Sequence, residues 1–162
     1  MKLTARHHFK ASPDRVLAML TDPAFLAHAC ERLGAHSHEV TVDGEASGSP
    51  TTSTRAVVEA PSEVSRFIGK TLTVVQTVAW GPRTASGGRD GRLDIAVPGL
   101  PVTLTGAAAL SGTDAETSID YDGELTVNVP FVGRQIEEQA APEITGVLNS
   151  QQAIGEEWLA TH

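Results

Sequence analysis

The chain has 162 residues, of which 40% are hydrophobic and 20% are charged, so it is long enough to bury one core and we expect a single domain over residues 1–162. Its formal net charge of -8 argues against nucleic acid as a partner. Aromatic residues, at 4%, are also too few for the stacking platforms that bind single strands.

The first third of the sequence predicts one strand followed by two short helices. Residues 2–10 alternate between apolar and polar side chains, which is typical of a strand with one buried face. Two helix starts follow, Ser12-Pro13-Asp14 and Asp22-Pro23, each with a capping side chain directly before a proline. Gly34 is placed to end the second helix.

The middle of the sequence predicts an antiparallel sheet. Apolar residues recur with a period of two in six segments, which are residues 36–42, 51–60, 70–80, 88–97, 101–111 and 116–129. Residues 61–69 are expected to form a loop or a single helical turn. Successive hairpins imply antiparallel pairing, and a sheet with one apolar face needs a cover.

Residues 130–162 predict the covering helix. The apolar stripe comprises Val132, Ile136, Ala140, Ile144, Val147, Ile154 and Trp158, and the opposite side comprises Arg134, Glu138, Asn149, Gln152 and Glu156. Pro142, on the outer side, predicts a bend. Gln151 lies within the stripe and Glu143 at its edge, which a dry interface would rarely accept. This indicates a polar or hollow space beneath the helix.

The order of elements and several local motifs resemble a known superfamily over essentially the whole chain. The motifs are the opening strand, Ser12-Pro13-Asp14-Arg15-Val16, Asp22-Pro23, Val129-Pro130-Phe131-Val132-Gly133 with Ile136-Glu137, and Glu157-Trp158-Leu159. They resemble the helix-grip superfamily called SRPBCC, which includes START lipid-transfer domains and the birch pollen allergen, and they look like an uncharacterised actinobacterial branch of it.

The resemblance implies an α+β helix-grip fold. In that fold a curved seven-stranded antiparallel sheet wraps around a long C-terminal helix, two short helices follow the first strand, and an apolar cavity lies inside. The resemblance implies no particular activity, because the superfamily includes carriers, cyclases, hydrolases and co-chaperones.

The inward face of the predicted sheet combines small and polar residues. Small residues in the middle of strands either let the sheet bend or leave room for a ligand, and convergent polar groups would orient that ligand. The expected ligand-binding residues are His7, His36, His38, Gln76, Trp80, Gly91, Leu104, Gly106, Ala108, Tyr121, Gly123, Glu143, Val147, Gln151 and Ile154. The residues expected at the cavity mouth are Phe67, Ile68, Leu100 and Phe131.

Other chemistry has weaker support in the sequence. His36 and His38 could bind a metal with His7 on a neighbouring strand as third ligand, but two imidazoles alone are a weak pattern, so we predict no metal and no cofactor. Cys30, the single cysteine, lies among apolar residues and is expected to be a buried structural thiol. We assign no catalytic residue.

Three functions stay open. The favoured one is binding or carrying a small hydrophobic molecule, such as a lipid, fatty acid or polyketide-like compound, between the sheet and the last helix. An enzyme (cyclase, hydratase or hydrolase) using a cavity histidine or Tyr121 as acid or base is less favoured, because strand parity directs no acid inward. The third is a protein-interaction or co-chaperone-like module whose acidic surface meets a basic partner.

The sequence also indicates the cellular compartment in which the protein is expected. No apolar run approaches the roughly twenty residues of a membrane span, and residues 1–10 lack the apolar centre of a signal peptide. One cysteine fits a reducing compartment. We therefore expect a cytoplasmic protein without integral membrane association, and the sequence indicates no oligomeric state.

Overall fold

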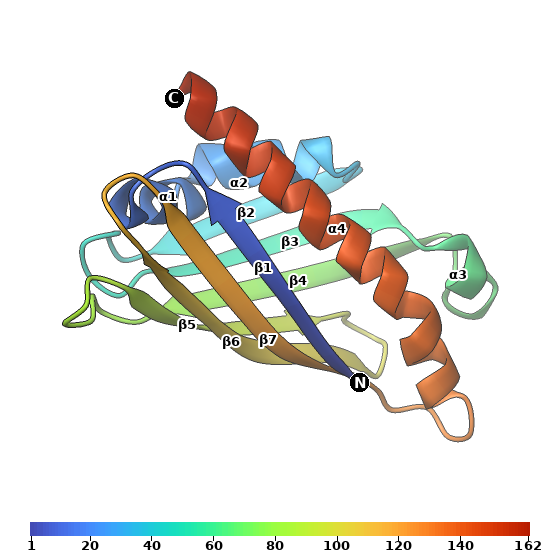
Figure 1. The fold of residues 1–162 in the computed structure, drawn as a ribbon. Helices are drawn as coiled ribbons and strands as arrows, with labels where there is room; N and C mark the ends of the chain where they lie inside the picture. Colours follow the sequence, from blue (N-terminus) through green and yellow to red (C-terminus); the bar gives the residue numbers. More distant parts are fainter.

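The seven strands form one antiparallel sheet in the order β1-β7-β6-β5-β4-β3-β2. The computed structural model describes residues 1–162, except for the side chains of Glu63 and Val64. The elements in chain order are β1 (Lys2–Phe9), α1 (Pro13–Leu20), α2 (Pro23–Arg32), β2 (Ser37–Asp43), β3 (Thr51–Glu59), α3 (Ser62–Ile68), β4 (Thr71–Trp80), β5 (Arg89–Ala96), β6 (Val102–Gly112), β7 (Thr117–Val127) and α4 (Gly133–Thr161) (Figure 1). The predicted order of strand, two helices, six strands and long helix is confirmed.

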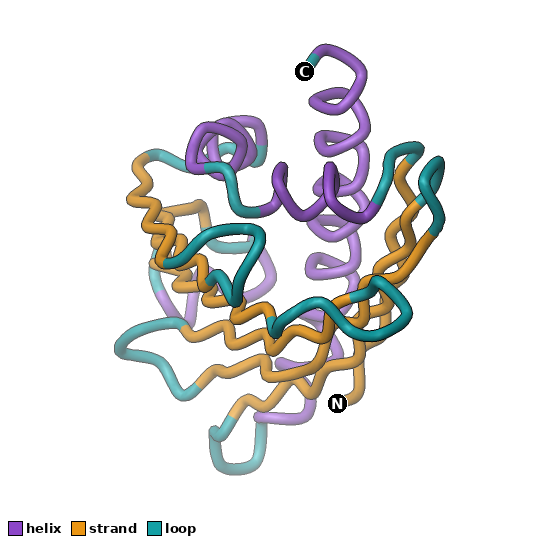
Figure 2. Tube along the Cα trace, turned by 90° about the vertical axis from the view of Figure 1, so that its left-hand side faces the viewer, coloured by secondary structure: helices purple, strands orange, loops and turns teal.

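The sheet curves into a trough that holds α4. Viewed along the trough, the strands surround the long helix on several sides (Figure 2). The helix packs mainly against β1 and β7, and α2 covers β2 at the opposite edge of the sheet. The predicted helix-grip fold is therefore confirmed. Within the described part of the chain, none of the helices is both long enough and apolar enough to cross a membrane.

The short helices begin where their capping residues predict. The Ser12 hydroxyl accepts a hydrogen bond from the Arg15 N–H at 3.3 Å, and the Asp22 carboxylate accepts one from the Ala24 N–H at 2.9 Å. Gly34, just beyond α2, has a φ of 86°, a conformation that favours glycine. Residues 62–68, for which we expected a loop or one turn, form the short helix α3 instead.

The densest packing fills one end of the trough. There α1 and the C-terminal half of α4 meet the ends of β1, β4 and β6 and the start of β7. The buried residues of this core include Phe9, Val16, Leu17, Met19, Trp80, Ala108, Leu110, Ile119 and Ile154. The Thr117 hydroxyl, fully buried, donates to the Ala11 carbonyl at 2.7 Å and ties β7 to the segment before α1.

The long helix agrees with its predicted pattern only in part. It runs without interruption through Pro142, although that residue has no N–H for the helical hydrogen bond, and the bend expected there stays a prediction. Gln152, which the helical pattern placed on the outer side, accepts a hydrogen bond from the His8 N–H at 2.9 Å. The physical reason is that α4 lies beside β1, an edge strand whose outer N–H groups have no neighbouring strand to pair with.

Replacing glycine with alanine is expected to have opposite effects on stability at two positions of α4. A Cβ added at Gly155 would lie 2.7 Å from the buried Phe9 ring, whereas one added at Gly146 would meet nothing within 4 Å. Gly155→Ala is expected to lower the free energy of unfolding by about 1–3 kcal/mol through overpacking. Gly146→Ala is expected to raise it by about 0.5–1 kcal/mol through helix propensity. Urea unfolding of both variants checks this, and stabilisation by both would contradict the close packing of α4 on Phe9.

Candidate functional site

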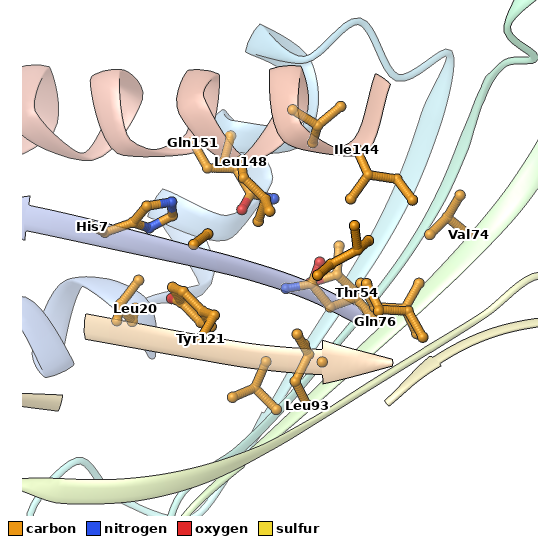
Figure 3. Close-up of a pocket in the computed structure, with 18 of the residues that line it drawn as sticks. His7, Leu20, Thr54, Val74, Gln76, Leu93, Tyr121, Ile144, Leu148 and Gln151 are labelled. Atoms are coloured by element: carbon orange, nitrogen blue, oxygen red, sulfur yellow. The ribbon is translucent and has the colours of Figure 1, made fainter. Parts of the chain in front are cut away.

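A cavity of about 370 Å³ lies between the inner face of the sheet and the middle of α4 (Figure 3). Its volume is within the range of small-molecule sites. The wall is largely aliphatic and aromatic, and its residues come from most strands, from α1 and α2, and from α4. They include Leu3, Leu20, Phe25, Leu26, Leu72, Val74, Val78, Leu93, Ile95, Val102, Leu125, Ile144 and Leu148.

Most of the residues predicted from strand parity and from the helix stripe are part of this wall. Those that line the cavity are His7, Gln76, Trp80, Leu104, Tyr121, Gly123, Glu143, Val147 and Gln151. Strand parity placed the sheet residues among them correctly because successive side chains of a strand point to opposite faces, and the helical pattern placed the three residues of α4. Their role in binding a ligand stays a prediction.

Four predicted residues lie on the inner side but outside the cavity wall. The space that Gly91 leaves is taken by the Trp80 ring, which a Cβ at residue 91 would approach to 2.8 Å. Gly106 lets β6 and β7 come close, since a Cβ there would collide with the Asp122 carbonyl. These two glycines therefore allow close packing and leave no room for a ligand at their positions. Two further residues belong to the packed core, namely Ala108 and Ile154.

The two histidines near β2 also lie away from the cavity. His36 is exposed, with Nε2 3.9 Å from the Glu59 carboxylate, and His38 is half-buried opposite Ala56 of β3. The idea that His7 could join them on a neighbouring strand is wrong, because β1 and β2 are the two opposite edges of the sheet. Among the described side chains, no three His, Cys, Asp or Glu residues gather as metal ligands.

The residues expected at the mouth do not line the cavity either. Phe67 and Phe131 are exposed on α3 and on the loop before α4, and Ile68 and Leu100 are half-buried. The exposed lining residues on α4 are Glu143 and Val147. The cavity therefore opens to solvent beside this helix.

His7 is a buried polar group of the cavity wall. It is 5% exposed, its Nε2 has no hydrogen-bond partner, and its ring packs edge-on against Tyr121 with centroids 5.0 Å apart. Burial lowers the pKa of His7, and a hydrogen bond with the Leu148 carbonyl partly opposes this. The Leu148 carbonyl thus lies near the His7 ring, while Nε2 has no partner.

The other polar groups of the wall are spread along it. Figure 3 shows Gln151 projecting from α4 into the interior near His7, while Gln76 and Thr54 lie further along the cavity. Burial raises the pKa of Tyr121 to about 12, so its hydroxyl stays protonated at neutral pH. The indole N–H of Trp80 is, with His7 Nε2, the other buried side-chain atom without a partner among the described residues.

Several residues that line the cavity were not predicted from the sequence. The inner residues of β3, Thr52 and Thr54, followed from strand parity but were not singled out because that strand alternates weakly. The contributions of α1 and α2, such as Leu20 and Ala29, depend on how these helices pack on the sheet. No local signal in the sequence gives that packing.

The burial of His7 predicts that stability falls in mild acid. Because its pKa is lowered in the folded chain, His7 takes up a proton at a lower pH there than in the unfolded chain, where its pKa has the ordinary value of about 6.5. The free energy of unfolding is therefore expected to decrease as the pH falls from about 7.5 to about 5. Urea titrations across this range check it, and His7→Gln should show a shallower decrease. An equal pH dependence in the variant would contradict the assignment.

Comparisons with known proteins identify the family and the fold. The family model described as "Protein of unknown function (DUF2505)" matches residues 4–159. No curated protein matches the sequence.

Three solved structures share the fold at low sequence identity. TTHA0849 from Thermus thermophilus is 16% identical, with 100% of both chains covered and a TM-score of 0.64. A STAR-related lipid transfer protein from Xanthomonas axonopodis is 13% identical over 95% of this chain and 85% of that chain, with a TM-score of 0.61. Norcoclaurine synthase from Thalictrum flavum is 15% identical over 100% of this chain and 87% of that chain, with a TM-score of 0.56. The chain thus belongs to the DUF2505 family and shares its helix-grip fold with these structures.

Proposed function

We propose that this protein binds or carries a small hydrophobic molecule in the cavity between the sheet and α4. The observation that carries the proposal is the cavity itself, about 370 Å³ of space with a largely aliphatic and aromatic wall. Burial of apolar ligand surface would supply the driving force, at about 25 cal/mol per Å².

The position of the cavity within the fold supports this proposal. The same trough is tightly packed at the end where α1 meets Phe9 and Ile154, and it is hollow beneath the middle of α4. Side chains beside an unfilled space lose the packing contacts that a neighbour would give them. A bound apolar molecule would restore these contacts, so the space is suited to a ligand.

The similar structures add support at the level of the superfamily. One of them is named as a lipid transfer protein and another as norcoclaurine synthase, so the same fold occurs both in a lipid carrier and in an enzyme. The carrier function agrees better with the wall of this cavity. His7 is 5.0 Å from the Tyr121 ring, but among the described residues no carboxylate bonds to its ring, and Glu143 lies exposed at the rim.

Two measurements on the purified protein test the proposal: identification of any compound that co-purifies with it, and binding of an apolar probe. Extraction into organic solvent followed by mass spectrometry is expected to release an apolar compound in near-equal amount to the protein. Protein stripped in this way and refolded is expected to bind the apolar fluorescent probe phenylnaphthylamine saturably. Stripped protein that shows no saturable uptake of the probe would contradict the proposal.

A further inference from the structure

Building on the proposed function, we infer that the ligand is an uncharged molecule with an apolar body and a hydroxyl group, whose O–H donates a hydrogen bond to Nε2 of His7. This narrows the ligand class, because it disfavours fatty acids and other carboxylates. Three features of the cavity wall lead to it.

The first feature is the charge of the wall. No Lys or Arg is among the described residues that line the cavity. Asp122 contributes from the outer face, where its carboxylate is 3.6 Å from the Lys2 ammonium, and Glu143 is exposed at the rim. A ligand carboxylate beside His7 would therefore be buried without a counter-ion, and one at the opening would meet Glu143. Burying an unpaired charge is far more costly than burying a hydroxyl that finds a partner.

The second feature is the unpaired acceptor. His7 is nine-tenths buried or more, on β1, and its Nε2 has no hydrogen-bond partner. We place the ring proton on Nδ1, where the nearby Leu148 carbonyl can accept it, so that Nε2 presents a lone pair to the cavity. A buried acceptor without a donor destabilises the protein, and only a group that carries a hydrogen can satisfy it. A ligand hydroxyl does so, whereas an ether or a carbonyl does not.

The third feature is the surrounding wall. Figure 3 shows Gln151 near His7 on the α4 side, and its amide offers a donor to the same hydroxyl oxygen. Beyond this polar end, the wall continues with Val74, Leu93 and Ile144, which suit an apolar body. The arrangement therefore fits a molecule with one polar end and an extended or compact hydrocarbon part.

Three compounds that share a twelve-carbon chain but differ in their polar end test the inference. Lauryl alcohol, lauryl methyl ether and lauric acid are titrated against the phenylnaphthylamine complex at neutral pH, each below its solubility limit and lauric acid also below its micelle concentration. Lauryl alcohol is expected to displace the probe most tightly, and lauric acid on the order of tenfold or more weakly, because its carboxylate loses hydration without gaining a cation. The methyl ether is also expected to bind more weakly than the alcohol, because it has no hydrogen to donate.

Variants at neighbouring positions locate the effect at His7. His7→Phe is expected to remove the preference for the alcohol over the ether. His8→Phe, on the opposite face of β1 with its side chain 46% exposed, is expected to keep it. Because a core variant can misfold, the nitrogen NMR resonance of His7 Nε2 is also followed in the wild-type protein. It is expected to shift with lauryl alcohol and not with the ether.

The outcomes separate this inference from the proposed function. Equal displacement by acid and alcohol, a preference that persists in His7→Phe, or an unmoved Nε2 resonance would each overturn the inference while probe binding still stands. Absence of saturable probe binding by the wild-type protein would overturn the proposed function, and the inference with it.

Discussion

Replacing Arg89 with methionine is expected to lower the free energy of unfolding by about 3–5 kcal/mol. Arg89 is 5% exposed, and its guanidinium donates to the carbonyls of Ala46 at 2.8 Å, Gly81 at 3.2 Å and Gly48. These carbonyls belong to the connection between β2 and β3 and to the segment after β4. Methionine fills similar volume but leaves the carbonyls without their charged donor, so both connections lose their anchor.

Arg92→Met is the matched control for Arg89→Met. Arg92 is three residues along the same strand but on the outer face, where its side chain is 76% exposed and 3.3 Å from Asp94. Such surface pairs contribute little, so its loss is expected to change stability by no more than about 0.5 kcal/mol. Urea unfolding followed by circular dichroism measures both variants. A similar small change in both would contradict the anchoring role of Arg89.

Filling the cavity is expected to abolish binding while the fold persists. The double variant Ala5→Leu, Thr54→Leu adds aliphatic volume from β1 and from β3, two strands whose inner residues line the space. Because the added side chains occupy the room of the ligand, the affinity for phenylnaphthylamine is expected to fall on the order of 100-fold. The free energy of unfolding is expected to stay equal or to rise, since the new side chains bury apolar area in an existing space.

Its matched control places similar side chains on the outer face of the sheet. Thr103→Leu, Ala109→Leu alters two exposed positions of β6, and it is expected to leave probe affinity unchanged. Fluorescence titration of both double variants gives the comparison. Wild-type affinity in the filled variant would show that the probe binds elsewhere.

The sequence predicted the elements well because their signals are local. Strand alternation and the caps at Ser12 and Asp22 depend only on neighbouring residues. Strand parity likewise placed Gln76 and Tyr121 on the inner face, where both line the cavity. Parity gives the face of a strand but not its position in the sheet. His38 has the predicted face, yet it lies on the edge strand β2, which α2 covers.

The features that the sequence did not predict depend on contacts between different elements of the fold. Gly91 left room, but the Trp80 ring of the adjacent strand occupies it. Gln152 looked solvent-facing because a helical pattern contains no information about an edge strand running alongside. Arg89 gave no signal, since its burial requires carbonyls from two connections that only the folded sheet brings together.

Intermolecular NOEs between bound phenylnaphthylamine and the methyl groups of the wild-type protein test most directly whether the space beneath α4 is a binding site. The proposal predicts NOEs from the probe to Ile144 and Leu148 of the helix together with Val74 and Leu93 of the sheet. NOEs confined to the surface around the exposed Phe67 and Phe131 would contradict it.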